Sequence, residues 1–590
     1  MGVMAYTPYG ASGIIIRVEA DIRRGIPGVD ITGLAEGAVR EARERVRAAF
    51  RNSGFKFPPD RILINLAPAG LRKDGAALDL PIALSVMAAA GIVPLSGDIL
   101  VLGELELSGN IRPVRGVLAA IAEGLDSGIG EFIVPARNIR EAAILGVDRG
   151  SRPAARFAAA ANLKEAASAL FLREENGGLP LFDQSGADFA EGAGNTVFGG
   201  AAGAAKITGD FAEVRGQRVY KRVLEIAAAG GHNALVFGPP GAGKTMLARR
   251  ISSIMPPLDP DEAVEVTRLY SLAGPSRAGG RGFGERFDSR QAARSPDEMD
   301  FIDGLITHPP FRSPHHSASA EGILGGGKIP RPGEISLAHF GILFLDEAPE
   351  FRANVLQALR EPLEDRVISI SRAEGPVRLP AEFQLFLAAN ACPCGRLGAR
   401  DSGGFQGIAV PETGASTKKN RSMGGEFGRL QSCFCSSEEI YRYWRKFGGA
   451  LLDRVELRIA VLPPETGEMG FSPDSSDSGE ETSAEIARRV LAAVEIQRHR
   501  FKNQGIRRNC RISAGMMSVC CPLTHRAQTA FNSIMTKMGL SARAYHGILR
   551  VARTIADLEG SELIDTVHIL EAIQHRRQGD DPFEVLSALK

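Results

Sequence analysis

The segment that most constrains this chain is a glycine-rich loop that joins an apolar run to a helical pattern. The apolar run is Ala234–Phe237, the loop reads GPPGAGKT over residues 238–245, and MLARRISSIM follows. Glycines let backbone N–H groups turn towards phosphates, the lysine reaches the β and γ phosphates, and the hydroxyl at the helix start can ligate Mg²⁺. The loop therefore predicts an ATP and Mg²⁺ site made of Gly238, Pro239, Pro240, Gly241, Ala242, Gly243, Lys244 and Thr245.

A second apolar run ends in two adjacent acids. Ile342–Leu345 is followed by Asp346 and Glu347, about a hundred residues after the glycine-rich loop. Such a strand can place Asp346 on the Mg²⁺ shell and Glu347 beside the attacking water as general base. The alternative is a buried strand with a solvated acidic end, but the complete loop upstream favours ATP hydrolysis.

Three further polar residues have the types and order that a ring-forming ATPase needs. Asn390 ends the run QLFLAAN and could orient the attacking water, although a strand-end turn residue would look the same. Arg454 could reach a neighbouring subunit's γ-phosphate, or it could make a surface ion pair with Asp453. Arg543 could contact nucleotide from a helical lid, or it could be a solvated helix start.

Composition divides the chain into three folded blocks. A Gly- and Ala-rich stretch and an acidic, Ser-rich stretch contain few large apolar residues and are typical of linkers. The predicted division is a first domain at 1–170, a linker at 171–209, an ATPase core at 210–463 with a cysteine-pair insertion at 392–435, a second linker at 464–482 and a helical domain at 483–590. The first block mixes β-branched runs with helical patterns, the second has strands apolar throughout, and the third has helical periodicity. The predicted class is therefore a multidomain α/β protein.

Charge and apolar patterning limit where the protein can act. Lys and Arg total 70 and Asp and Glu total 69, so the formal net charge is +1 and any contact with nucleic acid must be local. The start of the chain lacks the pattern of a secretory signal. The longest apolar stretch, Ala76–Leu95, contains an aspartate and two prolines and predicts a buried helix and not a membrane span. We expect a cytoplasmic protein with no membrane partner.

Four of the seven cysteines form two close pairs. Cys392 and Cys394 make one pair, Cys433 and Cys435 the other, and positions 395 to 432 lie between them. Four thiolates suffice for one tetrahedral Zn²⁺, although structural sites usually have at least two residues inside each pair. Reduced cysteines used as small buried apolar side chains are the alternative.

Two basic segments are candidates for DNA contact. Between the nucleotide motifs, FRSPHH and GGGKIPR combine cations with flexible glycines, which suits a loop that grips a phosphate backbone. The residues concerned are His315, His316, Lys328 and Arg331. The histidines could instead serve the local structure or bind a metal. The second candidate is RHRFK at 498–502 with Arg507, Arg508 and Arg511, where a solvated face is the ordinary alternative.

These motifs together resemble the ComM/YifB family of magnesium-chelatase-like AAA+ ATPases. The resemblance runs nearly end to end and includes VRGQRVYKRVLEIAAAGGHN, FRSPHHSASAEGILGGGKIPRPGEISLAHFGILFLDE, ANACPCG, CFCS, LLDRVEL and SARAYHGILRVARTIADLEGS. It implies a AAA+ P-loop core, a C-terminal helical lid and a homohexameric ring. It also implies a DNA helicase that promotes branch migration on single-stranded or branched DNA in natural transformation, alongside recombination proteins.

The same resemblance makes the first block similar to the domain shared by Lon proteases and ribosomal protein S5, an α+β fold. In Lon-type proteases the nucleophilic serine stands at the place of Ala77, and the lysine base falls at the place of Leu118 or Ala120. Because a serine–lysine mechanism needs both groups, proteolysis is not expected; Lys73 and Asp74 are expected to form an ordinary turn. The rival functions are a metal-insertion chaperone like the magnesium chelatase ATPase subunit and a protein-remodelling ATPase.

Overall fold

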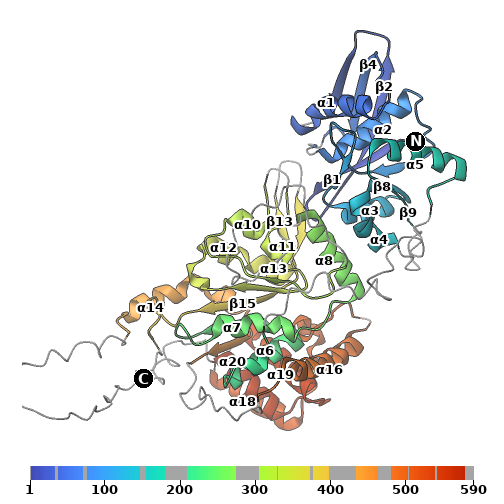
Figure 1. The fold of residues 1–590 in the computed structure, drawn as a ribbon. Coiled ribbons are helices and arrows are strands. Elements are labelled where there is room, and N and C mark those ends of the chain that lie inside the picture. Colours follow the sequence, from blue (N-terminus) through green and yellow to red (C-terminus); the bar gives the residue numbers. More distant parts are fainter. Residues whose placement is uncertain are drawn as a thin grey trace, which may run out of the picture.

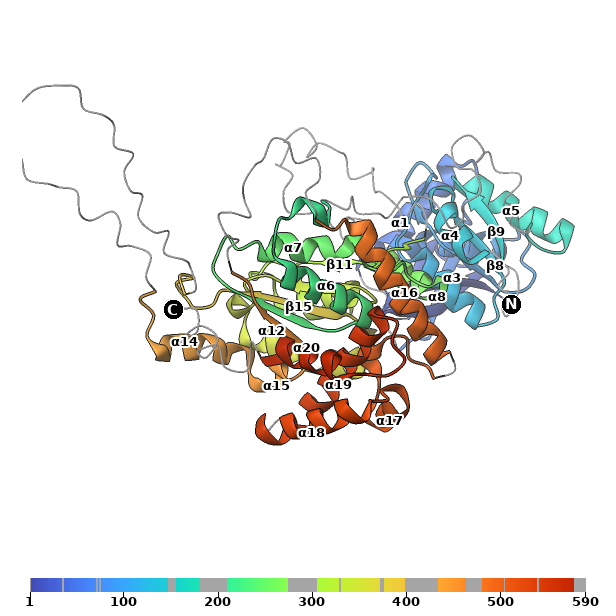
Figure 2. The same cartoon turned by 90° about the horizontal axis from the view of Figure 1, so that it is seen from below.

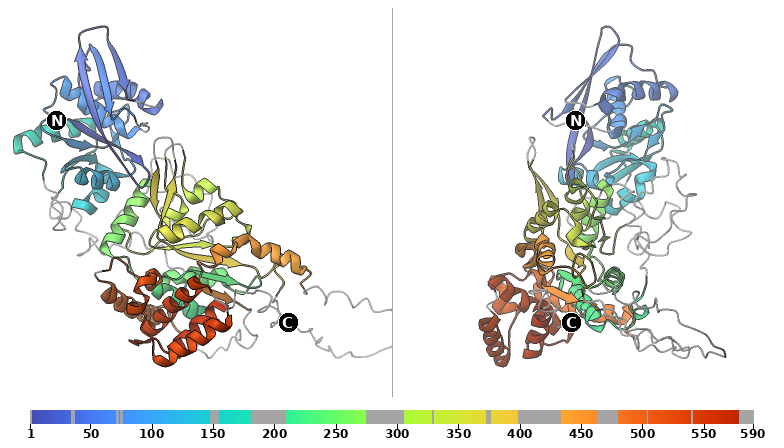
Figure 3. Two further views of the ribbon diagram at one scale, coloured as in Figure 1. Left: turned by 180° about the vertical axis from the view of Figure 1, so that it is seen from behind. Right: turned by 90° about the vertical axis from the view of Figure 1, so that its left-hand side faces the viewer.

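Three domains follow one another along the chain and in space (Figure 1). The computed structural model describes residues 2–33, 37–70, 73, 76–146, 155–180, 209–273, 305–327, 330–371, 376–397, 433–462, 480–502, 504–538 and 541–577. The N-terminal domain lies at one end, the core domain in the middle and the helical domain at the other end, as the views from behind and from the side also show (Figure 3).

The N-terminal domain is built on a mixed seven-stranded sheet with strand order β3-β4-β2-β1-β5-β8-β9. Its strands are β1 (Val3–Tyr9), β2 (Ser12–Arg23), β3 (Gly28–Thr32), β4 (Arg61–Ala67), β5 (Ile99–Val101), β8 (Glu131–Pro135) and β9 (Arg156–Ala160), with a separate hairpin of β6 (Glu104–Leu105) and β7 (Ile111–Arg112). Its helices are α1 (Gly37–Asn52), α2 (Asp79–Ala89), α3 (Val117–Asp126), α4 (Ile139–Gly146) and α5 (Leu163–Asn176). Helix α2 is the buried helix predicted within the longest apolar stretch.

Two features of this domain differ from the sequence-based expectation. Helix α5 crosses the boundary drawn at residue 170, and Leu179 beyond it is still part of the domain's core. Lys73, expected in an ordinary turn, is fully buried, and its ammonium group donates to the carbonyls of Gly33, at 2.9 Å, and Pro68. Burial lowers the pKa of Lys73. Asp74 and positions 181–208 of the linker predicted at 171–209 lie outside the described residues.

The core domain contains a five-stranded parallel sheet with order β11-β12-β15-β10-β16. Its strands are β10 (Ala234–Phe237), β11 (Phe311–Arg312), β12 (Ile342–Leu345), β15 (Gln384–Ala389) and β16 (Leu457–Ala460), and β13 (Val367–Ile370) and β14 (Val377–Pro380) form a hairpin beside it. Strands β10, β12 and β15 are buried along their whole length, as expected for a parallel sheet covered on both faces. The helices of the core domain are α6 (Arg218–Gly230), α7 (Lys244–Arg250), α8 (Pro260–Ala273), α10 (Ala320–Leu324), α11 (Glu334–Leu337), α12 (Ala353–Ala358), α13 (Arg360–Asp365), α14 (Ser437–Trp444) and α15 (Gly449–Leu452).

The described part of the C-terminal domain is helical, with one isolated bridge between Leu523 and Ile564. Its helices are α16 (Ser483–Phe501), α17 (Met517–Cys520), α18 (His525–Met538), α19 (Ala542–Leu558) and α20 (Thr566–Arg577). Ser541 caps α19, because its hydroxyl accepts the N–H of Ala544 at 3.2 Å. Helix α6 of the core shares one apolar cluster with α16 and α19, and the view from below shows these helices together (Figure 2).

Helix α8 joins the core to the N-terminal domain. Leu272 on α8 packs into an apolar cluster of the N-terminal domain, and the Ser271 hydroxyl donates to the buried Glu141 carboxylate. Burial raises the pKa of Glu141, and the hydrogen bonds that its carboxylate accepts only partly offset this rise. A second contact joins the β1–β2 turn to the core, where Gly10 N–H donates to the carbonyl of Pro330 at 3.1 Å.

Among the helices of the described residues, none combines the length and the apolar character that crossing a bilayer would require.

Candidate nucleotide site

The glycine-rich loop lies at the carboxyl end of β10, between neighbouring strands β15 and β16. Gly241 and Gly243 adopt positive φ angles of 80° and 84°, which ordinary side chains rarely adopt. A Cβ atom at Gly238 would lie 2.0 Å from the carbonyl oxygen of Val461, the residue directly after β16, so this position must be glycine. Helix α7 starts at Lys244, and its first N–H groups face the loop as a phosphate cradle requires.

Lys244 is buried at the centre of this loop. Its ammonium group donates to the carbonyls of Gly238 and Pro239, both at 2.8 Å, and to Oδ1 of Asn390 at 3.2 Å. Burial lowers the pKa of Lys244 to about 8, and the nearby Asp346 and Glu347 carboxylates only partly offset this decrease. The ammonium is thus held by three oxygens that phosphate oxygens could replace. The structure brings Asn390, predicted as a water-orienting residue, directly to this lysine.

Thr245 and Asp346 meet although about a hundred residues separate them. The Thr245 hydroxyl donates to Oδ2 of Asp346 at 2.8 Å. A hydroxyl and a carboxylate are hard oxygen ligands of the kind that Mg²⁺ prefers, together with phosphate oxygens and water. The pair therefore fits the Mg²⁺ site expected from the two motifs, and the residues that would hold the ion are these two.

Glu347 follows Asp346 and points into an open position. Its φ of 49° is left-handed, its N–H donates to Oδ1 of Asp346 at 3.0 Å, and its side chain is 56% exposed. Oε2 of Glu347 lies 3.5 Å from Nδ1 of His316. His316 was expected to contact DNA; its observed neighbour is the candidate general base. The sequence contained no signal for this contact.

Arg454 and Arg543 come together on one carboxylate. A terminal guanidinium nitrogen of each lies 2.5 Å from Oε1 of Glu364, on α13. Arg454 does not form the alternative pair with Asp453, whose described partner is Arg576 at 3.6 Å. The Arg454 guanidinium also donates to the carbonyl of Ala450. Within the described part of the chain, the ion pairs of both arginines lie at Glu364 and not at the nucleotide loop.

The four paired cysteines gather at one point. Their ligand atoms all lie within 4.8 Å of one another, and three of the Sγ–Sγ distances are 3.4, 3.6 and 3.6 Å. A tetrahedron with Zn–S bonds of 2.3 Å has edges of about 3.8 Å. The seven cysteines are free thiols. The donor set and spacing therefore fit Zn²⁺, with Cys392, Cys394, Cys433 and Cys435 as the ligands.

The segments that carry the cysteine cluster pack against the nucleotide site. Gly395 directly follows the first cysteine pair, and its backbone lies close to the glycine-rich loop. A Cβ atom at Gly395 would lie 3.3 Å from Cδ of Pro240 in that loop. Trp444, on the helix after the second pair, donates its indole N–H to Ala391 at 3.1 Å and packs edge-on against Phe237 at 5.2 Å between ring centroids. Positions 398 to 432 between the pairs lie outside the described residues.

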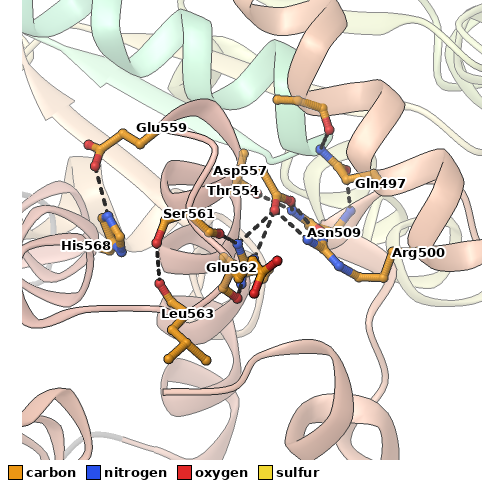
Figure 4. A network of polar contacts seen from close by, with 12 residues as sticks. Gln497, Arg500, Asn509, Thr554, Asp557, Glu559, Ser561, Glu562, Leu563 and His568 are labelled. Carbon is orange, nitrogen blue, oxygen red and sulfur yellow. Dashed lines mark hydrogen bonds and ion pairs between the residues drawn. The ribbon is translucent and has the colours of Figure 1, made fainter. Parts of the chain in front are cut away.

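The basic segment around residues 498–511 is used within the molecule. Arg500 and Asn509 both donate to the buried Asp557, which also accepts from Arg553 (Figure 4). Three further arginines pair with acids of the core: Arg498 with Asp259, Arg507 with Glu262 and Arg511 with Glu382. Four arginines of this segment are therefore engaged in ion pairs within the molecule, three of them in contacts between the helical domain and the core.

The other residues predicted to contact DNA have different structural surroundings. His315 holds its own turn, since its Nδ1 lies 2.7 Å from the Ser317 hydroxyl. Arg331 is exposed and pairs its backbone with Gly326 in a short bridge. Lys328 lies outside the described residues.

The positions that would carry protease chemistry are apolar and packed. Ala77 lies against the cluster that contains Ala120, and Leu118 is fully buried. No hydroxyl nucleophile or lysine stands at these three places.

Known families cover the three domains in turn. The family described as magnesium chelatase, subunit ChlI matches residues 210–295, 285–406 and 416–469. The family described as subunit ChlI of Mg-chelatase matches residues 18–138, and the ChlI C-terminal family matches residues 480–576.

Two similar proteins align with nearly the whole chain, and a third aligns with a shorter part. The YifB protein of Salmonella typhimurium is 36% identical over 95% of this chain and 94% of its own length. Competence protein ComM of Haemophilus influenzae is 36% identical over 96% of this chain and 95% of its own. A Lon protease of Geobacter metallireducens is 24% identical over 23% of this chain and 17% of its own.

Proposed function

Since the chain belongs to the YifB and ComM family of magnesium-chelatase-like AAA+ ATPases, we propose that it is a ring-forming, ATP-driven motor that acts on DNA. Its proposed reaction is helicase-driven branch migration when incoming DNA recombines with the chromosome. The observation that carries the ATPase part is the convergence of Lys244, Asn390, Thr245 and Asp346 at the carboxyl edge of one parallel sheet.

Each residue of this group has a distinct proposed role. Lys244 exchanges its carbonyl partners for β- and γ-phosphate oxygens, which supply the negative charge that a buried ammonium lacks. Thr245 and Asp346 hold Mg²⁺, which neutralises phosphate charge when bound. Glu347 takes the proton of the attacking water, and Asn390 orients that water.

The arginine pair supports a ring. Arg454 and Arg543 pair with Glu364 and lie away from the lysine of their own chain, and in a ring they would exchange this carboxylate for the γ-phosphate of a neighbouring copy. A guanidinium that enters from a neighbour stabilises charge on the transferred phosphoryl group and makes hydrolysis depend on assembly. We propose a homohexamer in which every interface completes one active site.

The cysteine cluster enters this proposal as a structural zinc site. Zinc would fix the loop that carries Gly395 against Pro240 and would thereby hold the glycine-rich loop in its shape. A metal bound in this way contributes to folding and takes no part in hydrolysis.

The DNA part rests on the family and on a relative named a competence protein. The exposed turn that carries Arg331 and the preceding glycines is the proposed contact with single-stranded or branched DNA. Because the net charge is only +1, binding must depend on such local cations and must weaken steeply with salt.

The test is the steady-state ATPase rate of the purified protein alone and with single-stranded DNA, duplex DNA or a branched junction, with Lys244→Ala as the inactive control. We expect stimulation by single-stranded or branched DNA, followed by ATP-dependent movement of a synthetic junction. An assembled, active enzyme that neither binds nor responds to any DNA at low salt would refute the DNA assignment. Activation by a protein substrate or by a tetrapyrrole-pathway subunit would then indicate one of the rival functions.

A further inference from the structure

Two exposed aromatic side chains lie on one short segment of the core, residues 433–445, named here the α14 segment. Among the described residues, the exposed Phe, Tyr and Trp side chains are Phe171 at 47%, Phe434 at 70% and Tyr441 at 59%. Phe434 and Tyr441 both belong to the α14 segment, whereas Phe171 lies on α5 of the N-terminal domain. A single exposed apolar residue needs no explanation, but two aromatic rings this close along the chain indicate a binding surface.

The cysteine cluster holds the backbone on both sides of Phe434. Cys433 and Cys435 flank this residue, and Sγ of Cys433 lies 3.6 Å from Sγ of both Cys392 and Cys394. The two flanking cysteines pack against the apolar cluster of the core, while the phenyl ring between them is exposed to solvent. The backbone that carries the ring is therefore already ordered, which lowers the entropy cost of binding a ligand on it.

Helix α14 presents Tyr441 from a firmly packed base. The hydroxyl of Ser436 accepts the N–H of Glu439 at 3.2 Å, and the Glu439 carboxylate accepts the N–H of Ser436 at 2.8 Å, so the helix start is capped in both directions. The buried residues of the helix are Ile440, Tyr443 and Trp444. Tyr441 lies on the exposed face, and α14 stands at the edge of the core domain that is farthest from the N-terminal domain (Figures 1 and 2).

The cations of the α14 segment suit a polyanionic ligand. Arg445 lies one helical turn after Tyr441, is exposed, and pairs with no acid among the described residues. Arg442 donates to Glu438 at 3.0 Å, but both side chains are largely exposed, so this pair contributes little free energy and a phosphate can replace it. The second acid of the helix, Glu439, is occupied by the cap.

A single strand of nucleic acid combines the two chemistries that this segment offers. Its unpaired bases have flat faces that stack on aromatic rings, and its phosphates pair with arginines. Bases in a duplex are already stacked on one another and become accessible only when they are unpaired. Three residues of chain and one helical turn separate Phe434 from Tyr441, so their Cα atoms are at most about 17 Å apart and one strand can reach both rings.

We propose that Phe434 and Tyr441 form a stacking platform for single-stranded nucleic acid, with Arg445 as a phosphate contact beside it. This inference deepens the DNA function proposed above and rests on it. It adds a base-stacking surface, on an element distinct from the exposed turn that carries Arg331.

The test measures the dissociation constant of the full-length protein for a fluorescein-labelled oligothymidylate at low salt by fluorescence anisotropy. The variants are Phe434→Ala, Phe434→Trp, Tyr441→Ala and Arg445→Gln, and the matched control is Phe171→Ala, which removes an exposed ring from another domain. A parallel titration uses a strand of the same length whose nucleotides are abasic. Thermal unfolding and gel filtration with ATP check that each protein is folded and assembled. Tyr441 lies outside the cysteine cluster, so its variant tests the inference even if Phe434→Ala disturbs that cluster.

We expect Phe434→Ala and Tyr441→Ala each to raise the dissociation constant for oligothymidylate by about tenfold. Phe434→Trp, which keeps an aromatic face, and Phe171→Ala should stay near the wild-type value. On the abasic strand, the two alanine variants should bind as the wild type does, because no base is present to stack. Arg445→Gln should weaken the binding of both strands and reduce the slope of log K against log salt by about 0.7.

The two proposals fail in different ways. If the wild type binds oligothymidylate and both alanine variants bind it equally tightly, the DNA function stands, the rings are left to a protein partner and the inference is wrong. Equal losses on the thymidine and abasic strands would also overturn it, as would a folded variant that no longer assembles, which would assign the surface to a contact between copies of the chain. A wild type that binds no single strand at low salt would refute the DNA function itself and this surface with it.

Discussion

Arg454 and Arg543 share one carboxylate oxygen, Oε1 of Glu364, with a guanidinium nitrogen of each 2.5 Å away. Arg454 belongs to the core domain and Arg543 to the first turn of α19 in the helical domain. Two like charges at one point repel unless an anion lies between them. The arrangement is thus a site for a shared negative charge, which Glu364 fills within one chain and a neighbour's γ-phosphate would fill in a ring.

Mixing two inactive variants tests whether Arg454 acts across an interface. Arg454→Ala alone and Lys244→Ala alone should each lose at least about 100-fold in ATPase rate. In a one-to-one mixture, random assembly gives about a quarter of the interfaces both an intact Lys244 and an intact Arg454 from the neighbour. We therefore expect the mixture to recover up to about a quarter of the wild-type rate. Activity no higher than that of the separate variants would show that both residues act within one chain.

Asp346→Asn should remove hydrolysis while the fold is retained. The asparagine oxygen can still accept the Thr245 hydroxyl, so the melting temperature should change little. The loss of negative charge weakens Mg²⁺ binding, and we expect kcat to fall at least about 100-fold and the Mg²⁺ concentration for half-maximal activity to rise. A magnesium titration of the ATPase rate measures both. Normal activity at ordinary Mg²⁺ would exclude Asp346 from the metal site.

Elemental analysis should find about one zinc ion per chain. Removal by a chelator, or Cys394→Ser, should lower the melting temperature by at least about 5 °C, because metal binding adds to folding free energy. The matched control is Cys510→Ser, whose thiol lies away from the cluster. A metal-free protein with an unchanged melting temperature would indicate that the four thiols pack without an ion.

His232 should make the contact between core and helical domain sensitive to acid. Its ring is fully buried, its Nε2 lies 2.8 Å from the Thr554 hydroxyl, and that hydroxyl donates to the carbonyl of Arg550. Nε2 must therefore carry the proton, and Nδ1 has no described partner for a second one. Burial, aided by Arg550, lowers the pKa of His232 to about 3.

The sign of the effect follows from this lowered pKa. The unfolded chain takes up a proton near pH 6.5 and the folded protein does not, so stability is full above that pH and falls as the pH drops towards 3. At pH 5 the loss from this group is about 2 kcal/mol. In urea unfolding, His232→Gln should show a smaller drop in stability between pH 7 and pH 5 than the wild type. Equal drops would assign the acid sensitivity to other groups.

Local sequence patterns were sufficient for the elements of the nucleotide site. Ala234–Phe237 and Ile342–Leu345 were predicted as strands and are strands with the same bounds. These features depend on residues within one strand or one helical turn, whose spacing and chemistry are visible in the sequence.

The partners of the charged and reactive side chains were decided by the tertiary structure. The pairing of β11 with β12 brings His316 to Glu347, and the position of the start of α19 brings Arg543 to Glu364 on α13 and not to the lysine of its own chain. The basic run at 498–511 has the composition of a DNA-binding segment, yet Arg498, Arg500 and Arg507 pair with acids far away in the sequence.

The sequence by itself thus determined the ATP-binding motif, the family and the order of its domains, since each rests on residues close together along the chain. Which residue faces which across the site is a property of packing. A side chain pairs with the group that the fold places within a few ångströms of it. For Arg454, Arg543 and His316, that partner lies between 31 and 179 positions away along the chain.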